Sequence, residues 1–108
     1  MDDILTEKLT KWYDHINVLK KSESDVMNLE SSERALFAVL FLNSGDGSVA
    51  VRESVVHSSS EWASFQKGLV EAKVRYNKDK RILELLQKAF DAEYLTYKLE
   101  HDAIKKFK

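Results

Sequence analysis

Apolar residues recur at helical spacing along the first 42 positions of the chain. From Leu5 to Leu19 they follow one another by three or four residues, which places them on one face of a helix. The segment at 20–34 is more polar, though Val26 continues the phase, and Leu29, Leu36 and Leu40 then resume a seam slightly rotated from the first. The pattern therefore predicts one helix over about 3–42, with a candidate weak point within 22–34. The positions that define this face are Leu5, Leu9, Trp12, Ile16, Leu19, Leu29, Leu36 and Leu40.

A second and more regular run begins at Trp62. Its steps of three and four residues continue to Ile104 without a slip, which is typical of the seam of a coiled coil or a long helical bundle. We therefore expect a long helix over about 60–106. The seam consists of Trp62, Phe65, Leu69, Ala72, Tyr76, Asp79, Leu83, Leu86, Phe90, Glu93, Tyr97, Glu100 and Ile104.

The segment between the two runs contains the residues that favour a turn. The chain has no proline, and two of its three glycines, Gly45 and Gly47, lie within 43–48 among Asn, Asp and Ser, so the chain is expected to reverse there. Ser48 is placed to cap a short helix over about 49–57. Ser58 and Glu61 have the spacing of a capping box at the start of the last helix.

Two long helices of similar length predict an all-α fold, a long antiparallel helical hairpin with a short middle helix, in a single domain over residues 1–108. Ile82, Leu85, Ala89, Tyr94 and Leu95 widen the apolar face of the last helix beyond its seam, so the middle helix or another copy of the chain must cover the excess. We favour self-association as a homodimer that forms a four-helix bundle, with a trimer or tetramer as alternatives. The proposed self-association seam is Trp62, Phe65, Leu69, Leu83, Leu86, Phe90 and Tyr97.

The composition of the chain argues against several classes of function and of binding partner. The formal net charge is −1, from 17 basic and 18 acidic side chains, so no overall field selects nucleic acid or an anionic membrane. No cysteine is present, which excludes disulfides, thiolate metal sites and cysteine nucleophiles. The longest apolar run, 35–42, is far shorter than the ~20 residues of a membrane-spanning helix. We expect a cytoplasmic protein without a membrane partner.

Charge is divided unevenly along the chain. Residues 1–54 hold six basic and ten acidic side chains, and residues 55–108 hold eleven basic and eight acidic ones. This division favours pairing of an acidic arm with a basic one. Five basic residues lie within 73–81 and form the candidate contact for a partner or for nucleic acid, although the favoured interpretation of this stretch is a solvated helix face. They are Lys73, Arg75, Lys78, Lys80 and Arg81.

The sequence contains no pattern that indicates catalysis, so we expect no enzyme, no cofactor and no metal. None of His15, His57 and His101 has a second histidine at i+4 or a glutamate three residues before it, the spacings that helical metal sites use. His101, between Glu100 and Asp102, is the least implausible ligand. Trp12, Trp62 and Phe65 are interpreted as packing residues.

The middle of the chain resembles a group of small helical phage and prophage proteins. The resemblance rests on 47–53 (Gly-Ser-Val-Ala-Val-Arg-Glu), on 59–62 (Ser-Ser-Glu-Trp) and on a long final helix, and it covers residues 35–105. Val51 stands where that group often carries a charged residue. The final helix shares with the group Ala72, Tyr76, Arg81, Leu83 and Glu93.

The resemblance implies a phage origin and a neighbourhood of single-strand annealing and other recombination genes, and hence a host-cell cytoplasmic location. The leading hypothesis is a non-enzymatic helical interaction protein, a phage accessory factor that acts with DNA replication or recombination proteins, with direct DNA binding left open. One alternative is an inhibitor that binds a host protein, such as a defence nuclease. Another is a structural coiled-coil assembly module.

Overall fold

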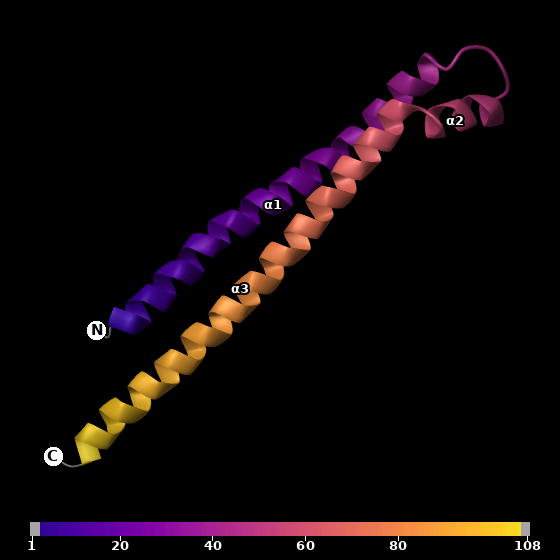
Figure 1. Ribbon diagram of the computed structural model, residues 1–108. Coiled ribbons are helices and arrows are strands. Elements are labelled where there is room, and N and C mark those ends of the chain that lie inside the picture. Colours follow the sequence, from indigo (N-terminus) through magenta and orange to yellow (C-terminus); the bar gives the residue numbers. More distant parts are fainter. Residues whose placement is uncertain (1–2, 107–108) are drawn as a thin grey trace. The chain divides into compact units, whose positions relative to one another are not determined.

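The chain folds into three α-helices (Figure 1). The computed structural model describes residues 3–106, with side chains for residues 3–104. The helices are α1 (Asp3–Leu42), α2 (Val49–His57) and α3 (Ser60–Lys106), and residues 3–106 contain no strand. The predicted all-α class is confirmed, and α1 runs through residues 22–34 without interruption.

The chain divides into two compact units, and each unit contains part of α1 and part of α3. Unit 1 contains Met1–Lys21 and Asn77–Lys108, and unit 2 is Ser22–Tyr76. In each unit the stretch of α1 pairs with a stretch of α3 that runs in the opposite direction (Figure 1), which confirms the predicted helical hairpin. The single-domain prediction and the completion of a bundle by self-association stay predictions.

Unit 1 is held together along the predicted seam. Leu5 is buried, and the rings of Trp12 and Phe90 pack with their centroids 5.4 Å apart. His15 adds a polar link, since its Nε2 lies 2.9 Å from the backbone oxygen of Asp79. A carbonyl oxygen only accepts, so Nε2 carries the hydrogen. The side chain of Asp79 is itself buried.

The end of the seam in unit 1 lies open. Ile104 is 59% exposed and Glu100 is also exposed, although both continue the heptad spacing of the buried positions. In this unit α3 continues past the N-terminal end of α1 (Figure 1). Periodicity alone predicted a covered seam as far as Ile104, whereas burial also requires a facing helix.

Unit 2 contains the other buried apolar residues. Val56 of α2 is 1% exposed, and Leu69 and Ala72 of α3 are also buried. Burying a Val or Leu side chain contributes roughly 1.5–3 kcal/mol, and Val56 is the buried residue of α2. Ser22 of α1 is a buried polar residue of the same unit.

A network around Arg52 closes the turn between α1 and α2. Its Nη2 donates to the backbone oxygen of Phe41 at 2.9 Å, and its Nε donates to Ser44 Oγ at 3.2 Å. The guanidinium also lies 4.2 Å from the centroid of the Phe41 ring, a cation–π distance. Gly45 and Gly47 adopt φ of 86° and 138°, which residues with a Cβ rarely adopt. The predicted turn therefore depends on two glycines and one arginine.

Serine side chains cap the N-terminal ends of the last two helices. The predicted cap at Ser48 is confirmed, because its Oγ accepts a hydrogen bond from the Val51 amide. The predicted capping box of Ser58 and Glu61 is wrong. Ser59 Oγ accepts from the Trp62 amide at 3.2 Å, whereas Ser58 is the C-cap residue of α2. Since α2 extends to His57, the linker is short and the capping role falls to the next serine.

Candidate interaction surfaces

The predicted basic stretch is exposed and is divided between the two units. In unit 2, Lys73 Nζ lies 3.6 Å from Glu30 Oε1 of α1, and both side chains are about half exposed. Arg75 borders a surface hollow that Asp25 and Glu71 also line. These neighbours fit the interpretation of an acidic first arm beside a basic last one. Exposed pairs of this kind contribute only about 0–1 kcal/mol, so both cations remain accessible to a partner.

The other three basic residues, Lys78, Lys80 and Arg81, belong to unit 1. All three side chains are exposed. Within residues 3–104, neither of the two ion pairs includes any of them. They therefore form exposed basic positions outside the two ion pairs of residues 3–104.

Two residues of the proposed self-association seam, Trp62 and Phe90, contact aromatic rings of α1. Leu69 is buried and the other six residues are half-buried. Phe90 faces Trp12, while Trp62 packs on Phe37 of α1 and on Phe65. A role for the seven side chains between copies of the chain stays a prediction.

An aromatic hollow in unit 2 is the feature that sequence reasoning missed. Phe37, His57 and Trp62 lie with ring centroids 5.6–5.8 Å apart. Together with Glu33 and Arg34 they line a surface hollow of about 280 Å³. The sequence places Glu33 and Phe37 one helical turn apart, but it does not reveal that His57 and Trp62 stand opposite them. Partly exposed aromatic rings beside charged groups are typical of residues that dominate protein interfaces.

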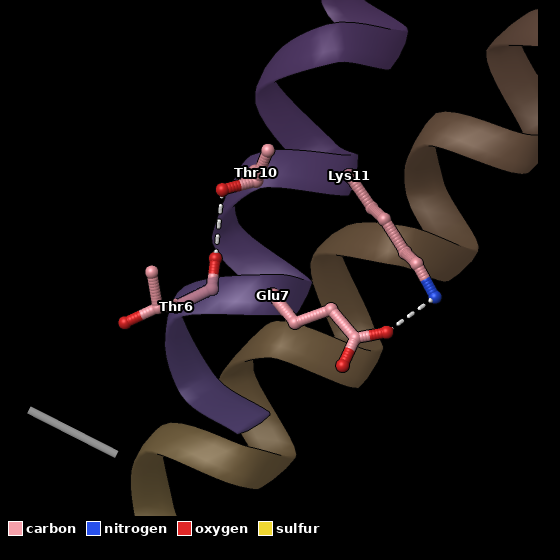
Figure 2. Close-up of polar contacts among 4 residues, drawn as sticks. All are labelled: Thr6, Glu7, Thr10 and Lys11. Atoms are coloured by element: carbon pink, nitrogen blue, oxygen red, sulfur yellow. Dashed lines mark hydrogen bonds and ion pairs between the residues drawn. The ribbon is translucent and has the colours of Figure 1, made fainter. Parts of the chain in front are cut away.

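The face of α1 shown in Figure 2 carries short-range polar contacts. Lys11 Nζ lies 3.0 Å from Glu7 Oε1, and Thr10 Oγ1 donates to the Thr6 carbonyl at 2.9 Å. The hydrogen bond and positive charge of Lys11 hold the pKa of Glu7 below its usual value. These are contacts within one helix and do not form a ligand site.

The histidines occupy three separate environments. His15 donates to a carbonyl, His57 belongs to the aromatic hollow, and His101 stacks on Tyr97 at 6.0 Å with nearly parallel rings. Among residues 3–104, no three His, Asp or Glu side chains are grouped so that they could hold a metal ion. His101, the least implausible ligand from the sequence, therefore has an aromatic neighbour and no described ligand cluster.

Within the described part of the chain, no helix is both long enough and apolar enough to cross a membrane. No protein-family model, no curated protein and no solved structure matches this chain. The surfaces themselves therefore carry the argument for function.

Proposed function

We propose that the chain is a non-enzymatic helical interaction protein that binds a protein partner as an accessory factor of DNA replication or recombination. It would act in the cytoplasm of a host cell, since the resemblance to phage and prophage proteins supports a phage origin. The same resemblance supports the replication or recombination setting. The surfaces described above support binding as the activity.

The observation that carries the proposal is the amount of apolar surface left open. Within the described residues, sixteen large hydrophobic side chains are between 46% and 75% exposed, whereas four hydrophobic residues are buried. Single exposed apolar residues are ordinary, whereas residues that share one face, such as Leu85, Leu95 and Leu99 at helical spacing on α3, are typical of interaction sites. Two paired helices cover one stripe each, so their outer faces are available to a partner.

The basic residues add a second kind of contact. Lys78, Lys80 and Arg81 are exposed on one helix and lie outside the chain's ion pairs within residues 3–104. Lys78 and Arg81, three residues apart, share one face of the helix while Lys80 lies on another, and exposed cations of this kind favour an acidic protein surface or a phosphate backbone. With a net charge of −1, the protein gains little from long-range attraction to DNA, so we place a protein partner first.

The test is an affinity capture of the tagged chain from extracts of infected and uninfected host cells, with and without nuclease. The wild type is compared with a variant that carries Lys78→Gln, Lys80→Gln and Arg81→Gln. A matched control carries Lys20→Gln, Lys21→Gln and Lys67→Gln, which removes the same charge at other exposed positions. The proposal predicts a replication or recombination protein that the wild type and the control retain and the variant loses.

Each other result points to a different function. Loss of the partner on nuclease treatment means that DNA bridges the two proteins. A stoichiometric complex with a host enzyme whose activity is blocked contradicts the proposal and supports the inhibitor hypothesis. Recovery of nothing except the chain itself also contradicts the proposal and supports a structural assembly module.

A further inference from the structure

A second heptad stripe runs along α3 on the side opposite the seam in unit 1. Its positions, 85, 88, 92, 95 and 99, are separated by three or four residues. All five are exposed, and Leu85, Leu95 and Leu99 are 59%, 56% and 61% exposed. Seam residues of the same stretch, such as Leu86 and Phe90, are half-buried. We name this exposed face the outer stripe: Leu85, Lys88, Ala92, Leu95 and Leu99.

The spacing of the outer stripe is the spacing of a coiled-coil contact. Apolar residues at alternating steps of three and four keep one face of a helix toward a partner helix. Within the chain the opposite side of α3 packs against α1, through pairs such as Phe90 with Trp12. Among the described residues of unit 1, α1 therefore lies on the other side of α3, and a second molecule can supply a helix that covers the outer stripe.

When two copies of α3 run antiparallel, two kinds of opposite-charge pair form beside the stripe, while the two Asp91 side chains approach each other at the axis. Glu84 then faces Lys98 of the second copy, and the same pair forms again on the other side of the two-fold axis. At the ends of the stripe, Lys78 faces Asp102 of the second copy. Glu84 and Lys98 are equally distant from residue 91, and Lys78 and Asp102 are equally distant from residue 90. Positions 90 and 91 are neighbours, so one two-fold axis beside them brings the side chains of both kinds of pair within reach of each other.

The apolar layers share this axis. Leu85 and Leu95 are also equally distant from residue 90, so the axis that pairs the charges places Leu85 against Leu95 of the second copy. Lys88 then meets the small side chain of Ala92. In a parallel dimer the two Lys88 side chains would face each other, which like-charge repulsion disfavours.

We propose that two copies of the chain associate through the outer stripe, with their α3 helices antiparallel and a two-fold axis beside residues 90–91. The contact is isologous, because the same surface of each copy meets its equivalent. It lies on the opposite side of α3 from the seam that sequence reasoning assigned to self-association. It goes beyond the proposed function and does not rest on it.

Charge reversal measured by sedimentation equilibrium tests the pairing. Glu84→Lys places like charges opposite Lys98 twice in the dimer, and Lys98→Glu does the same opposite Glu84. Each should raise the dimer dissociation constant about tenfold, given the modest strength of exposed pairs. The double variant should recover the wild-type value to within about threefold. If each single variant instead weakened the dimer by disturbing contacts within its own helix, the two losses would add up in the double variant, because both residues would lose their local partners.

The orientation has its own test, since the chain has no cysteine. Asp91→Cys places a thiol beside the axis, and a short bismaleimide should link the two copies. Thr96→Cys is the control, because an antiparallel dimer puts position 96 opposite position 84 of the other copy, ~18 Å along the helix from its own equivalent. Equal linking at both positions indicates a parallel dimer and overturns the proposal.

Leu95→Ser tests the apolar contact against Val70→Ser, which changes an exposed valine of α3 in unit 2. The first should abolish the dimer and the second should leave it unchanged, with the helical circular dichroism signal retained in both. A wild-type chain that is monomeric at every concentration overturns the proposal, as does a double charge reversal that weakens the dimer further.

Discussion

The ring of Trp12 in α1 packs against the ring of Phe90 in α3, with the centroids 5.4 Å apart and the planes inclined by 31°. Each residue belongs to an apolar run that the sequence defines. Their contact joins two segments almost eighty positions apart in the chain. It therefore reports directly on the antiparallel pairing of the helices in unit 1.

Replacing either ring should destabilise unit 1. Both residues are half-buried, so Trp12→Ala and Phe90→Ala should each cost about 2 kcal/mol, below the ~3–5 kcal/mol of a fully buried aromatic residue. In a double-mutant cycle the coupling should be about 0.5–1.5 kcal/mol. Urea unfolding followed by circular dichroism measures both. Tyr13→Ala, at a position 67% exposed, is the control, and a coupling of zero would refute the contact.

The start of α3 offers a test between neighbouring serines. Ser59 Oγ accepts from the Trp62 amide, so Ser59→Ala should cost about 1 kcal/mol. Ser58→Ala removes no cap of α3 and should stay within about 0.5 kcal/mol of the wild type. Thermal or urea unfolding of the two variants makes the comparison, and a larger loss at Ser58 would restore the capping box that the sequence predicts.

Arg52 should control how often the turn at 43–48 opens. Arg52→Ala removes two hydrogen bonds and a cation–π contact, and Arg52→Lys keeps the charge without the planar group that makes them. Both variants should increase amide hydrogen exchange and proteolysis at the turn, and the alanine variant should lose about 1–2 kcal/mol. Glu53→Ala, at the exposed neighbouring position, is the control. Unchanged exchange in both arginine variants would contradict the role of Arg52.

The Glu7 carboxylate should respond to its neighbour four residues away. Lys11→Ala removes the hydrogen bond and the positive charge that lower the pKa of Glu7, so the pKa should rise toward its usual value. Because the folded-state pKa is lowered, the stabilising effect of the pair is present above the unfolded-state pKa and disappears as the pH falls through the folded one. A carboxyl NMR titration measures the change. Lys8→Ala should give a smaller rise, since Lys8 is the lesser cause.

The hairpin followed from the sequence because heptad spacing and turn residues are local signals. The same signals failed where a neighbour was needed. Ile104 continues the seam but is 59% exposed, and in unit 1 α3 continues past the N-terminal end of α1 (Figure 1). Ser58 had the spacing of a cap, but the length of α2 gave that role to Ser59.

The candidate surfaces were predictable to different degrees. The basic residues could be identified from the sequence alone, whereas their neighbours Glu30 and Asp25 depend on the register between α1 and α3. The aromatic hollow was not predictable. It requires His57 at the end of α2 and Trp62 at the start of α3 to pack against Phe37 of α1. No spacing of residues along the chain predicts that these three rings come together.

The central claim is that one face of each long helix packs within the chain while the outer faces serve binding. Hydroxyl-radical footprinting with mass spectrometry tests it most directly, on the free chain and on the complex recovered by affinity capture. In the free chain we expect strong labelling at Tyr13 and Met27, which are 67% and 58% exposed, and protection at Leu69, and in the complex new protection on the outer faces alone. Equal labelling of Leu69 and Met27 in the free chain, or a complex that protects no outer residue, would contradict the account.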